Sequence, residues 1–563
     1  MKFEEMQYTR PDIGQKAGEV AGLAQKAAAA QSGKELLQVF AEYQEAADLL
    51  HTAATLASIR HTVNTKDEYY DAENDYFDQQ SPVFSDKTLA LYRALLASAH
   101  KGALKEEYGD ILLQKMEIAV KSSDERLVPL QQEENTLASQ YQKLYASARI
   151  PFRGSELTVA QLGPYKQDIN RATRKEAFEA EAGFFESHRE ELDDIYDKMV
   201  KNRTKQAQML GFESFTPLGD IRMERVGYTR AEIKACRKAV ETGIVPLNTA
   251  LRTMQASRSG LPGLAFYDLP LSFKDGNPTP KGTPEEILAA GRSMYNQLSP
   301  ETADFINFMM DGNRFVVVAK PGKAPGGYCT YSPGYQSPFI FSNFNGTAGD
   351  VDVLTHEAGH AFAAYMAAKQ PLVAELRNPG LESCEIHSMS MEFLTSEYHS
   401  LFFKQDTGKY EFTHAEDTLF FLPYGCMVDE FQEEVYNRPG LTPAQRNQLW
   451  MELEKKYRPG MEFAGLPFYS RGAGWQRQLH IYEVPFYYID YVLAQAVALE
   501  FFVSNMGNKA ETWQRYLALV NKAGTQSYTG LVHAAGFKTP FEEGALQQVG
   551  EKVFAWLKGH PLG

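Results

Sequence analysis

Apolar residues recur at helical spacing over most of this chain, and this pattern limits the fold more than any other feature. Between residues 14 and 120, for example, Leu36, Phe40 and Tyr43 follow one another at intervals of three or four positions. The pattern returns after residue 350 and holds almost to residue 556. Pro-Gly pairs at 379–380, 439–440 and 459–460 interrupt it within this region. A strand would alternate with a period of two instead. The sequence therefore predicts a mainly α-helical protein.

Short extended segments interrupt the helices at two places. Residues 150–159 alternate apolar and polar side chains around an Arg-Gly turn, which is typical of a β-hairpin. Three runs rich in β-branched and aromatic residues follow at 315–319, 326–331 and 337–343, with Gly and Pro turns between them. These runs predict a small β-sheet directly ahead of the long carboxy-terminal helical region. We interpret the Pro- and Gly-rich segment 262–284 as an irregular loop on the surface.

The length of 563 residues exceeds what a single core usually organises, so we expect two lobes around a cleft. We assign residues 1–190 to an amino-terminal helical lobe. Residues 191–563 are assigned to a second lobe, whose core we place at residues 314–500.

The charge balance disfavours nucleic-acid binding, because 57 Lys and Arg residues against 72 Asp and Glu residues give a formal net charge of −15. The four cysteines lie far apart and form no Cys-x-x-Cys pair, so neither a disulfide framework nor a thiolate zinc finger is predicted. The sequence contains no signal-peptide pattern and no uninterrupted run of about 18 apolar residues. We therefore expect a cytoplasmic protein with neither nucleic acid nor membrane as a partner.

The segment His356-Glu-Ala-Gly-His360 carries the most specific chemical pattern in the chain. Residues at i and i+4 share a helix face, so both imidazoles can point at one metal ion. Glu357 can then reach a ligand in an open coordination position. Zinc suits such a site, because it makes the proton of a water easier to remove. The competing interpretation is a pair of partly buried helix histidines with a surface glutamate.

A third metal ligand is expected on the next helix, which begins after the break at residues 378–381. The candidates there are Glu382, Glu385, His387 and Glu392. Spacing alone does not choose among them. Glu385 and Glu392 share one helix face, so one can bind metal while the other orients a histidine ligand. Asp352, one turn before His356, is a further candidate for an orienting role.

The motif and its surroundings resemble the oligoendopeptidase F branch of the thimet-oligopeptidase-like zinc peptidases, and within it the Pz-peptidase-type members. The resemblance covers most of the chain from about residue 157 onward and is sharpest at 326–495. In that family a glutamate about 25 residues beyond the second histidine opens the next helix. Glu385 stands 25 residues after His360, so the resemblance implies that His356, His360 and Glu385 hold one Zn²⁺ per chain.

The resemblance also implies the groups that approach the scissile carbonyl. Family members carry a histidine and one or more tyrosines in the segment that corresponds to residues 472–491 of this chain. The residues here are His480, Tyr487, Tyr488 and Tyr491. A phenol or imidazole donor stabilises the negative charge that builds on the carbonyl oxygen during hydrolysis. We favour His480 and Tyr488 as donors, and the alternative is an aromatic core patch with one satisfied histidine.

Two further features fit the same family. Gly359 inside the motif is family-like, and a small residue there lets the metal-binding helix lie close to a neighbour. The segment 326–331 looks like the edge strand on which such peptidases bind an extended substrate through main-chain hydrogen bonds. Its alternative interpretation is an ordinary edge strand with a glycine turn.

The resemblance implies a two-lobed helical zincin-type peptidase with a small sheet beside the active-site helix and a deep substrate channel. We hypothesise a zinc-dependent endopeptidase that hydrolyses internal bonds of short oligopeptides, as in peptide catabolism. Glu357 is the expected general base, and residues 191–563 are then the peptidase lobe. The rival hypotheses are a zinc exopeptidase of the carboxy-dipeptidase type and a non-catalytic helical scaffold that binds peptides.

Overall fold

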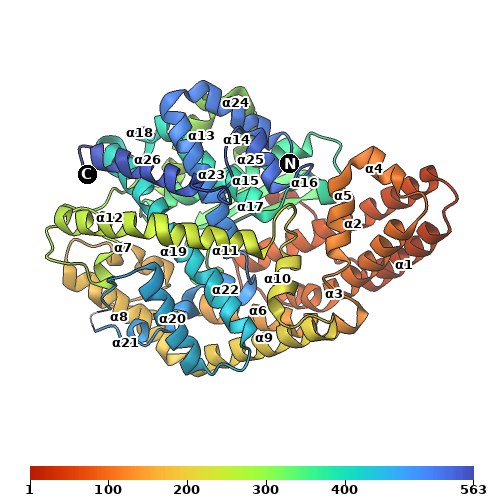
Figure 1. Ribbon diagram of the computed structural model, residues 1–563, viewed down its shortest axis with the longest axis horizontal. Coiled ribbons are helices and arrows are strands. Elements are labelled where there is room, and N and C mark those ends of the chain that lie inside the picture. Colours follow the sequence, from red (N-terminus) through yellow and green to blue (C-terminus); the bar gives the residue numbers. More distant parts are fainter. Residues whose placement is uncertain (464, 563) are drawn as a thin grey trace.

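The computed structural model describes residues 1–463 and 465–562 and is mainly helical, as the sequence predicts (Figure 1). The amino-terminal helices are α1 (Ile13–Ala29), α2 (Gly33–Val63), α3 (Glu68–Ala97), α4 (Gly102–Tyr108), α5 (Asp110–Ala119), α6 (Val128–Ala146), α7 (Gly163–Lys166), α8 (Arg171–Ser187) and α9 (Arg189–Met209). The central helices are α10 (Phe215–Arg222), α11 (Arg230–Ala239), α12 (Val245–Arg258), α13 (Pro284–Leu298), α14 (Pro300–Asp311), α15 (Gly349–Ala368), α16 (Ala374–Arg377), α17 (Leu381–Leu394) and α18 (Ser400–Phe403). The carboxy-terminal helices are α19 (Thr407–Asn437), α20 (Pro443–Tyr457), α21 (Pro467–Ser470), α22 (Leu479–Glu483), α23 (Tyr488–Gly507), α24 (Lys509–Val520), α25 (Tyr528–Ala534) and α26 (Ala545–Gly559). The strands are β1 (Ile150–Phe152), β2 (Ser155–Leu157), β3 (Phe315–Val318), β4 (Tyr328–Ser332) and β5 (Ser337–Phe344).

Capping residues in the sequence mark where several of these helices begin. The side chain of Ser32 accepts a hydrogen bond from the backbone N–H of Glu35 at the start of α2. At α13, Thr283 and Glu286 form a reciprocal capping box, and Pro284 occupies the first turn, where its missing N–H is not needed.

The first five helices form one end of the molecule, on the right in Figure 1, and they have a hydrophobic core of their own. Phe40 and Leu91 are fully buried in it. Val373 and Leu376, which lie next to or on α16, pack into the same core. The larger core of the molecule begins with Leu137 on α6. Helix α16 therefore connects the amino-terminal core to the region of the metal motif.

The strands form the two sheets that the sequence predicts. Strands β1 and β2 pair as an antiparallel hairpin, with positive φ angles of 49° at Arg153 and 84° at Gly154 in its turn. The second sheet has the order β3-β5-β4, in which β5 is parallel to β3 and antiparallel to β4. Strand β4 is therefore an edge of this sheet. Main-chain groups on its free side are available for another extended segment.

Helix α2 lies against β4 and ties the amino-terminal helices to the sheet. The hydroxyls of Thr62 and Tyr328 are 2.6 Å apart, and the Thr55 hydroxyl donates to the carbonyl of Tyr331 at 3.4 Å. These contacts come from opposite ends of β4. The side chains of α2 and the edge strand therefore share one wall of the interior.

Strand β5 leads through a short turn into α15, the helix that carries the histidine motif, and α15 packs closely on α17. A Cβ atom at Gly359 would lie 2.6 Å from the carbonyl oxygen of His387 and 2.6 Å from the Cα atom of Ser388. Any larger residue would force the two helices apart, because real Cβ atoms do not approach backbone so closely. The expected close approach at Gly359 is confirmed.

One local prediction from the sequence is wrong. The segment 262–284 is irregular, but Asp268, Leu271 and Phe273 within it are buried. The buried Asp268 carboxylate accepts hydrogen bonds from Arg171 and Arg174. This irregular segment is therefore a packed part of the fold, because ion pairs and apolar anchors hold it against α8.

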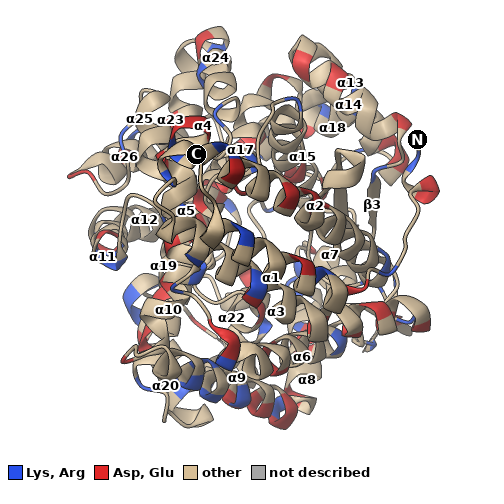
Figure 2. Cartoon of the chain, turned by 90° about the vertical axis from the view of Figure 1, so that its right-hand side faces the viewer, with Lys and Arg blue, Asp and Glu red and all other residues tan. Residues whose placement is uncertain are grey.

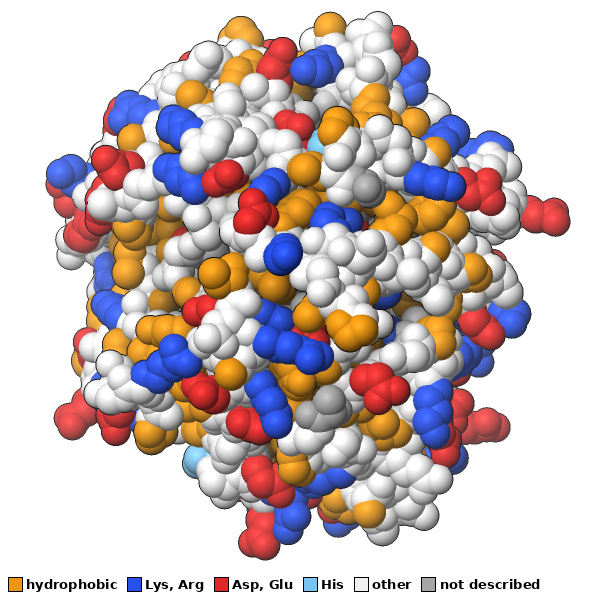
Figure 3. Space-filling view, turned by 90° about the vertical axis from the view of Figure 1, so that its left-hand side faces the viewer, with side chains coloured by type: hydrophobic (Ala, Val, Ile, Leu, Met, Phe, Trp, Pro, Cys, Tyr) orange, Lys and Arg blue, Asp and Glu red, His pale blue; other side chains and the backbone are white. Residues whose placement is uncertain are grey.

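The surface carries both signs of charge. Acidic and basic positions are interspersed along the ribbon in Figure 2, and acidic and basic side chains are interspersed over the face seen in Figure 3. Among the described residues, none of the helices combines the length and the apolar character that crossing a bilayer requires.

Candidate metal centre

Two helices bring together three metal-ligating side chains. His356 and His360 lie one turn apart on α15, and Glu385 faces them from α17. The Glu385 Oε2 atom is 3.1 Å from Nε2 of His356 and 3.2 Å from Nε2 of His360. The three donor atoms lie within 4.8 Å of one another, and Glu385 is almost fully buried. Within the described part of the chain, this is the group of residues with the geometry to hold a metal ion.

The surroundings of the two imidazoles favour a cation. The carboxylates of Glu357, Glu385 and Glu392 all face this part of the interior. Burial by itself lowers the pKa of His356, yet hydrogen bonds to Glu385 and Glu392 outweigh it and raise that pKa well above its usual value. Two imidazoles and a carboxylate are also the donor set that zinc takes in many catalytic sites. The residues present therefore fit a bound zinc ion.

Two acids beside the motif have different partners. Glu392 lies 2.7 Å from Nδ1 of His356 through one oxygen and 2.6 Å from Nε2 of His414 on α19 through the other. Asp352 instead accepts a hydrogen bond from the Tyr410 hydroxyl at 2.6 Å. Burial raises the pKa of Asp352 to about 7. Only Glu392 of this pair contacts a histidine of the candidate site directly.

Glu357 lies between the donor group and the edge strand. Its Oε2 atom is buried without a hydrogen-bond partner among the described residues, and its Oε1 atom lies 3.4 Å from the position of a Cβ built on Gly327. Burial raises the pKa of Glu357, and the charges of His356 and His360 partly offset this rise. An unpaired buried carboxylate beside a metal centre has the position of a proton acceptor.

The other candidates on α17, Glu382 and His387, are not part of the donor group, although His387 lines the same cavity. Glu382 is buried beside Gly380 and accepts a hydrogen bond from Ser383 at 3.4 Å. The Nε2 atom of His387 has no partner, and burial together with the nearby His360 lowers the pKa of His387 to about 3. His387 is thus neutral at physiological pH.

The histidine and tyrosines of α22 and α23 gather on one side of the metal centre. The Gln478 amide donates to Nδ1 of His480 at 2.8 Å, so the proton of the neutral imidazole is on Nε2. Burial lowers the pKa of His480 to about 4, which keeps it neutral. Its Nε2 atom lies 3.3 Å from the Tyr491 hydroxyl. The Tyr487 hydroxyl donates to Oε1 of Glu385.

Tyr488 contacts His480 but does not share the cavity of its two neighbours, and its ring centroid lies 5.0 Å from that of His480. Its ring packs against Phe421 and Tyr424, with centroid distances of 5.7 and 5.8 Å. Tyr487 and Tyr491 line the cavity that contains the metal donors, whereas Tyr488 is not among its lining residues. Figure 1 labels the two helices, α22 and α23, that carry these groups.

A cavity of about 510 Å³ contains the candidate site. Residues 326–331, which include most of the edge strand β4, form one wall, and His356, Glu357, His360 and Glu385 lie in the same cavity. His51 of α2 lines it near Tyr331, and Glu483 of α22 lines another part. The cavity thus joins the amino-terminal helices, the edge strand and the metal centre in one space.

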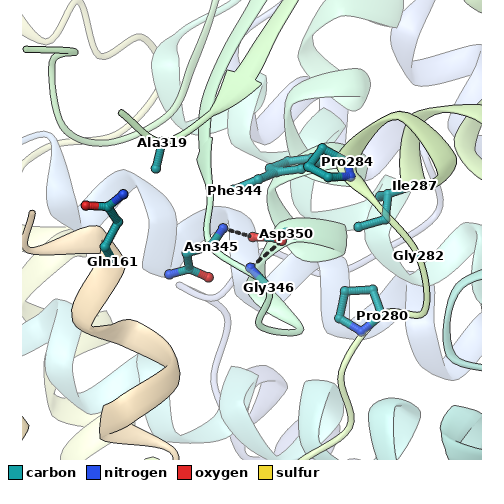
Figure 4. Close-up of a pocket in the computed structure, with 10 residues that line it drawn as sticks. All are labelled: Gln161, Pro280, Gly282, Pro284, Ile287, Ala319, Phe344, Asn345, Gly346 and Asp350. Carbon is teal, nitrogen blue, oxygen red and sulfur yellow. Dashed lines mark hydrogen bonds between the residues drawn. The ribbon is translucent and has the colours of Figure 1, made fainter. Parts of the chain in front are cut away.

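A second cavity, of about 310 Å³, lies at the start of α15 (Figure 4). The carboxylate of Asp350 accepts hydrogen bonds there from the backbone N–H groups of Asn345 and Gly346, both at 2.8 Å. The Asn345 amide donates to the carbonyl of Ala160. These polar groups satisfy one another and fix the turn between β5 and α15.

Two residues of the site were not predicted from the sequence. His414 lies on α19, and no local spacing links it to Glu392, whose carboxylate it contacts. Glu483 follows His480 by three positions, and this i, i+3 spacing on a helix is the signal that could have found it.

Comparisons with known proteins agree over the whole chain. The family profiles described as "Peptidase M3 N-terminal domain" and "Peptidase family M3" match residues 3–123 and 306–551. The structure of Pz peptidase A with inhibitor 2 is 43% identical, covers 100% of both chains and has a TM-score of 0.98. A protein described as an oligoendopeptidase F is 44% identical over 100% of this chain and 99% of its own, with a TM-score of 0.98.

Another protein with that description, from Bacillus anthracis, is 43% identical over 99% of this chain and 98% of its own, with a TM-score of 0.93. No curated protein matches the chain. The similarity begins at residue 3, so the sequence-based limit near residue 157 was too narrow. The two-lobed helical zincin-type fold is confirmed by these matches. This chain therefore belongs to peptidase family M3 and is a metallopeptidase.

Proposed function

We propose that this metallopeptidase is a zinc-dependent endopeptidase that cleaves internal bonds of short oligopeptides. One observation carries the proposal: a single cavity contains the His356, His360 and Glu385 donors, the unpartnered carboxylate of Glu357 and the edge strand β4. Peptidases of family M3 depend on zinc. A bound zinc ion supplies a Lewis acid that polarises the carbonyl and lowers the pKa of water.

Glu357 is the proposed general base. Its Oε2 atom has no competing hydrogen bond, so it is free to accept the proton of the attacking water. The same carboxyl group then transfers that proton to the amine that leaves. Burial, which raises the pKa of Glu357, favours the first step because it strengthens the carboxylate as a proton acceptor.

His480 and Tyr491 are the proposed donors to the carbonyl oxygen. The Nε2–H of His480 points toward the Tyr491 hydroxyl, so the Tyr491 proton remains available for a substrate oxygen. Tyr487 is proposed to orient Glu385, because its hydroxyl donates to that carboxylate. Tyr491 is proposed in place of Tyr488 because Tyr491 lines the cavity, whereas the ring of Tyr488 packs against Phe421 and Tyr424.

Strand β4 is proposed to bind the substrate main chain. An extended peptide that adds to the free edge gains hydrogen bonds that do not depend on its side chains. Gly327 lies next to Glu357, and the lack of a side chain there leaves room for the substrate beside the base. This arrangement favours broad sequence tolerance and excludes folded proteins, whose backbone is not free to extend into an interior cavity.

The division into an amino-terminal lobe at 1–190 and a peptidase lobe at 191–563 also remains a proposal. Helix α2 contributes His51 and Thr62 to the cavity wall, so the amino-terminal lobe is proposed to cover the substrate. One Zn²⁺ per chain is proposed, at His356, His360 and Glu385.

The decisive experiment uses an internally quenched peptide whose amino terminus is acetylated and whose carboxy terminus is amidated. We expect the zinc-loaded protein to cleave it at an internal bond, with products identified by mass spectrometry. Cleavage only of peptides with a free carboxylate would indicate an exopeptidase of the carboxy-dipeptidase type instead. Binding without cleavage by a protein that contains one zinc ion would indicate a peptide-binding scaffold.

A further inference from the structure

Glu483 is a half-buried acid that the proposed mechanism does not use. It is the last residue of α22 and lines the same 510 Å³ cavity as the metal donors. Its Oε1 atom is shielded from solvent and has no hydrogen-bond partner in the part of the chain that the structure describes. Among the described residues, no Lys, Arg or His side chain forms an ion pair with it, and burial alone raises its pKa to about 7.

Two buried acids elsewhere in the chain show what Glu483 lacks. Asp268 is paired with Arg174, and Asp429 is paired with Arg237, at 2.5 and 2.9 Å. A buried carboxylate without such a partner is unfavourable, because it has lost water and gained no opposite charge. The cavity next to Glu483 is the side from which a partner can arrive.

The position of Glu483 relates it to a peptide on the edge strand. Glu483 follows His480 by one helical turn, so the two side chains share a face of α22. A Cβ built on Gly326 would lie 3.6 Å from the Leu479 side chain, which puts the start of α22 beside the Gly326 end of the strand region. Gln142 of α6 lines the cavity too, and α22 packs on α6.

We propose that Glu483 is a specificity-determining residue whose carboxylate binds a positively charged group of the peptide substrate. The inference rests on the proposed endopeptidase function and adds a substrate class to it. A Lys or Arg side chain and a free amino terminus share the chemistry that a carboxylate recognises. Either cation supplies the missing partner, whereas a neutral or acidic group at the same place leaves the carboxylate unpaired or repels it.

The test uses the full-length zinc-loaded protein and internally quenched peptides of one sequence. A single Lys is moved along the peptide, and a matched peptide carries norleucine at the same position. Each peptide is made with a free and with an acetylated amino terminus. We expect Lys to raise kcat/KM by about tenfold to a hundredfold at one position, mainly through a lower KM.

The variants separate Glu483 from the rest of the protein. Glu483→Gln is expected to abolish the preference for Lys over norleucine, and Glu483→Lys is expected to favour a Glu at the same position. Glu213→Gln is the matched control, because Glu213 is an exposed loop residue, and it is expected to retain the wild-type preference. Thermal unfolding of each variant shows that it is folded.

The two sources of the cation give different results. If the preference for Lys over norleucine is unchanged by acetylation, the bound cation is the Lys side chain. If acetylation lowers kcat/KM by a comparable factor and Lys has no effect, the bound cation is the amino terminus. The inference would be overturned if the wild-type protein had the same kcat/KM for the Lys and norleucine peptides at every position and acetylation had no effect on it. This comparison needs no variant. Failure of the wild-type protein to cleave any of these peptides would contradict the endopeptidase function itself.

Discussion

The Nδ1 atom of His356 lies 2.7 Å from Oε1 of Glu392, and Oε2 of the same carboxylate lies 2.6 Å from Nε2 of His414. Glu392 thus joins the first histidine of the motif to a histidine of α19. An Nδ1–H that donates to the carboxylate leaves Nε2 of His356 as the atom free to bind metal.

Replacement of Glu392 by Gln is expected to weaken zinc binding about 10- to 100-fold, because the ring of His356 loses its orienting carboxylate. Competition with a chromophoric chelator measures the Kd without any need for activity. Glu397→Gln is the control, since Glu397 is exposed and its ion pair is with Lys509, away from the metal donors. Equal zinc affinity in wild type and Glu392→Gln would show that this contact does not orient the ligand.

Metal analysis distinguishes the two glutamates at the start of α17. Glu385→Gln is expected to lose most of the zinc, because it removes a charged donor within 3.2 Å of His360. Glu382→Gln is expected to retain zinc, since Glu382 lies beside Gly380 and Ser383. Zinc content after dialysis against zinc-free buffer reports both results, and the opposite order would move the third ligand to Glu382.

Glu357→Gln is expected to reduce kcat by about 10²- to 10⁴-fold, because an amide cannot accept the proton of the attacking water. Zinc content should remain that of the wild-type protein. Hydrolysis of the quenched peptide and metal analysis of the same preparation check both points. Near-normal turnover with zinc bound would exclude Glu357 as the base.

The adjacent tyrosines of α23 provide an internal comparison. Tyr491→Phe is expected to lower kcat by about a hundredfold, because it removes a hydroxyl that lies 3.3 Å from His480 in the cavity. Tyr488→Phe is the matched control and is expected to change kcat by less than about threefold. The assignment of the donor fails if the two substitutions have equal effects on kcat at unchanged zinc content.

Glu483 has a predicted pH-dependent effect on stability. Burial raises its pKa from 4.5 to about 7, so the unfolded chain releases this proton at lower pH than the folded protein. The folded state binds more protons between these values, and the contribution of Glu483 to stability therefore falls as pH rises from about 4.5 to about 7.

The Glu483→Gln variant has no titrating group at this position, so it does not lose stability there as pH rises from about 4.5 to about 7. Its Tm is expected to equal that of the wild-type protein near pH 4 and to exceed it by about 2 °C or more near pH 8. Differential scanning fluorimetry at the two pH values provides the comparison, and Glu213→Gln serves again as the control. A Tm difference that is the same at both pH values would show that Glu483 stays solvated in the folded protein.

Much of the architecture follows from local sequence patterns. The 150–159 segment forms the predicted hairpin, and the runs at 315–319, 326–331 and 337–343 correspond to β3, β4 and β5 within two residues at each end. Helical periodicity of 3.6 and strand periodicity of two are strong signals over such segments. The histidine pair on one face of α15 is likewise a local feature.

Long-range packing explains what local patterns could not predict. The contact between Glu392 and His414 joins α17 to α19, and the direction of each tyrosine depends on the exact start of α23. The burial of Phe273 depends on its contacts with later helices, which the Pro and Gly content of its segment does not reveal. The lobe boundary at residue 190 stays a prediction, while the amino-terminal core includes residues 13–116.

Gly359 has no side chain, yet it sets how far the helix that carries Glu385 stands from the helix that carries His356 and His360. The radius of the metal site is thus controlled at a position without any ligand atom. Enlarging this residue by one methyl group would widen the opening between the imidazoles and the carboxylate, so the choice among metal ions of different size depends on a missing side chain.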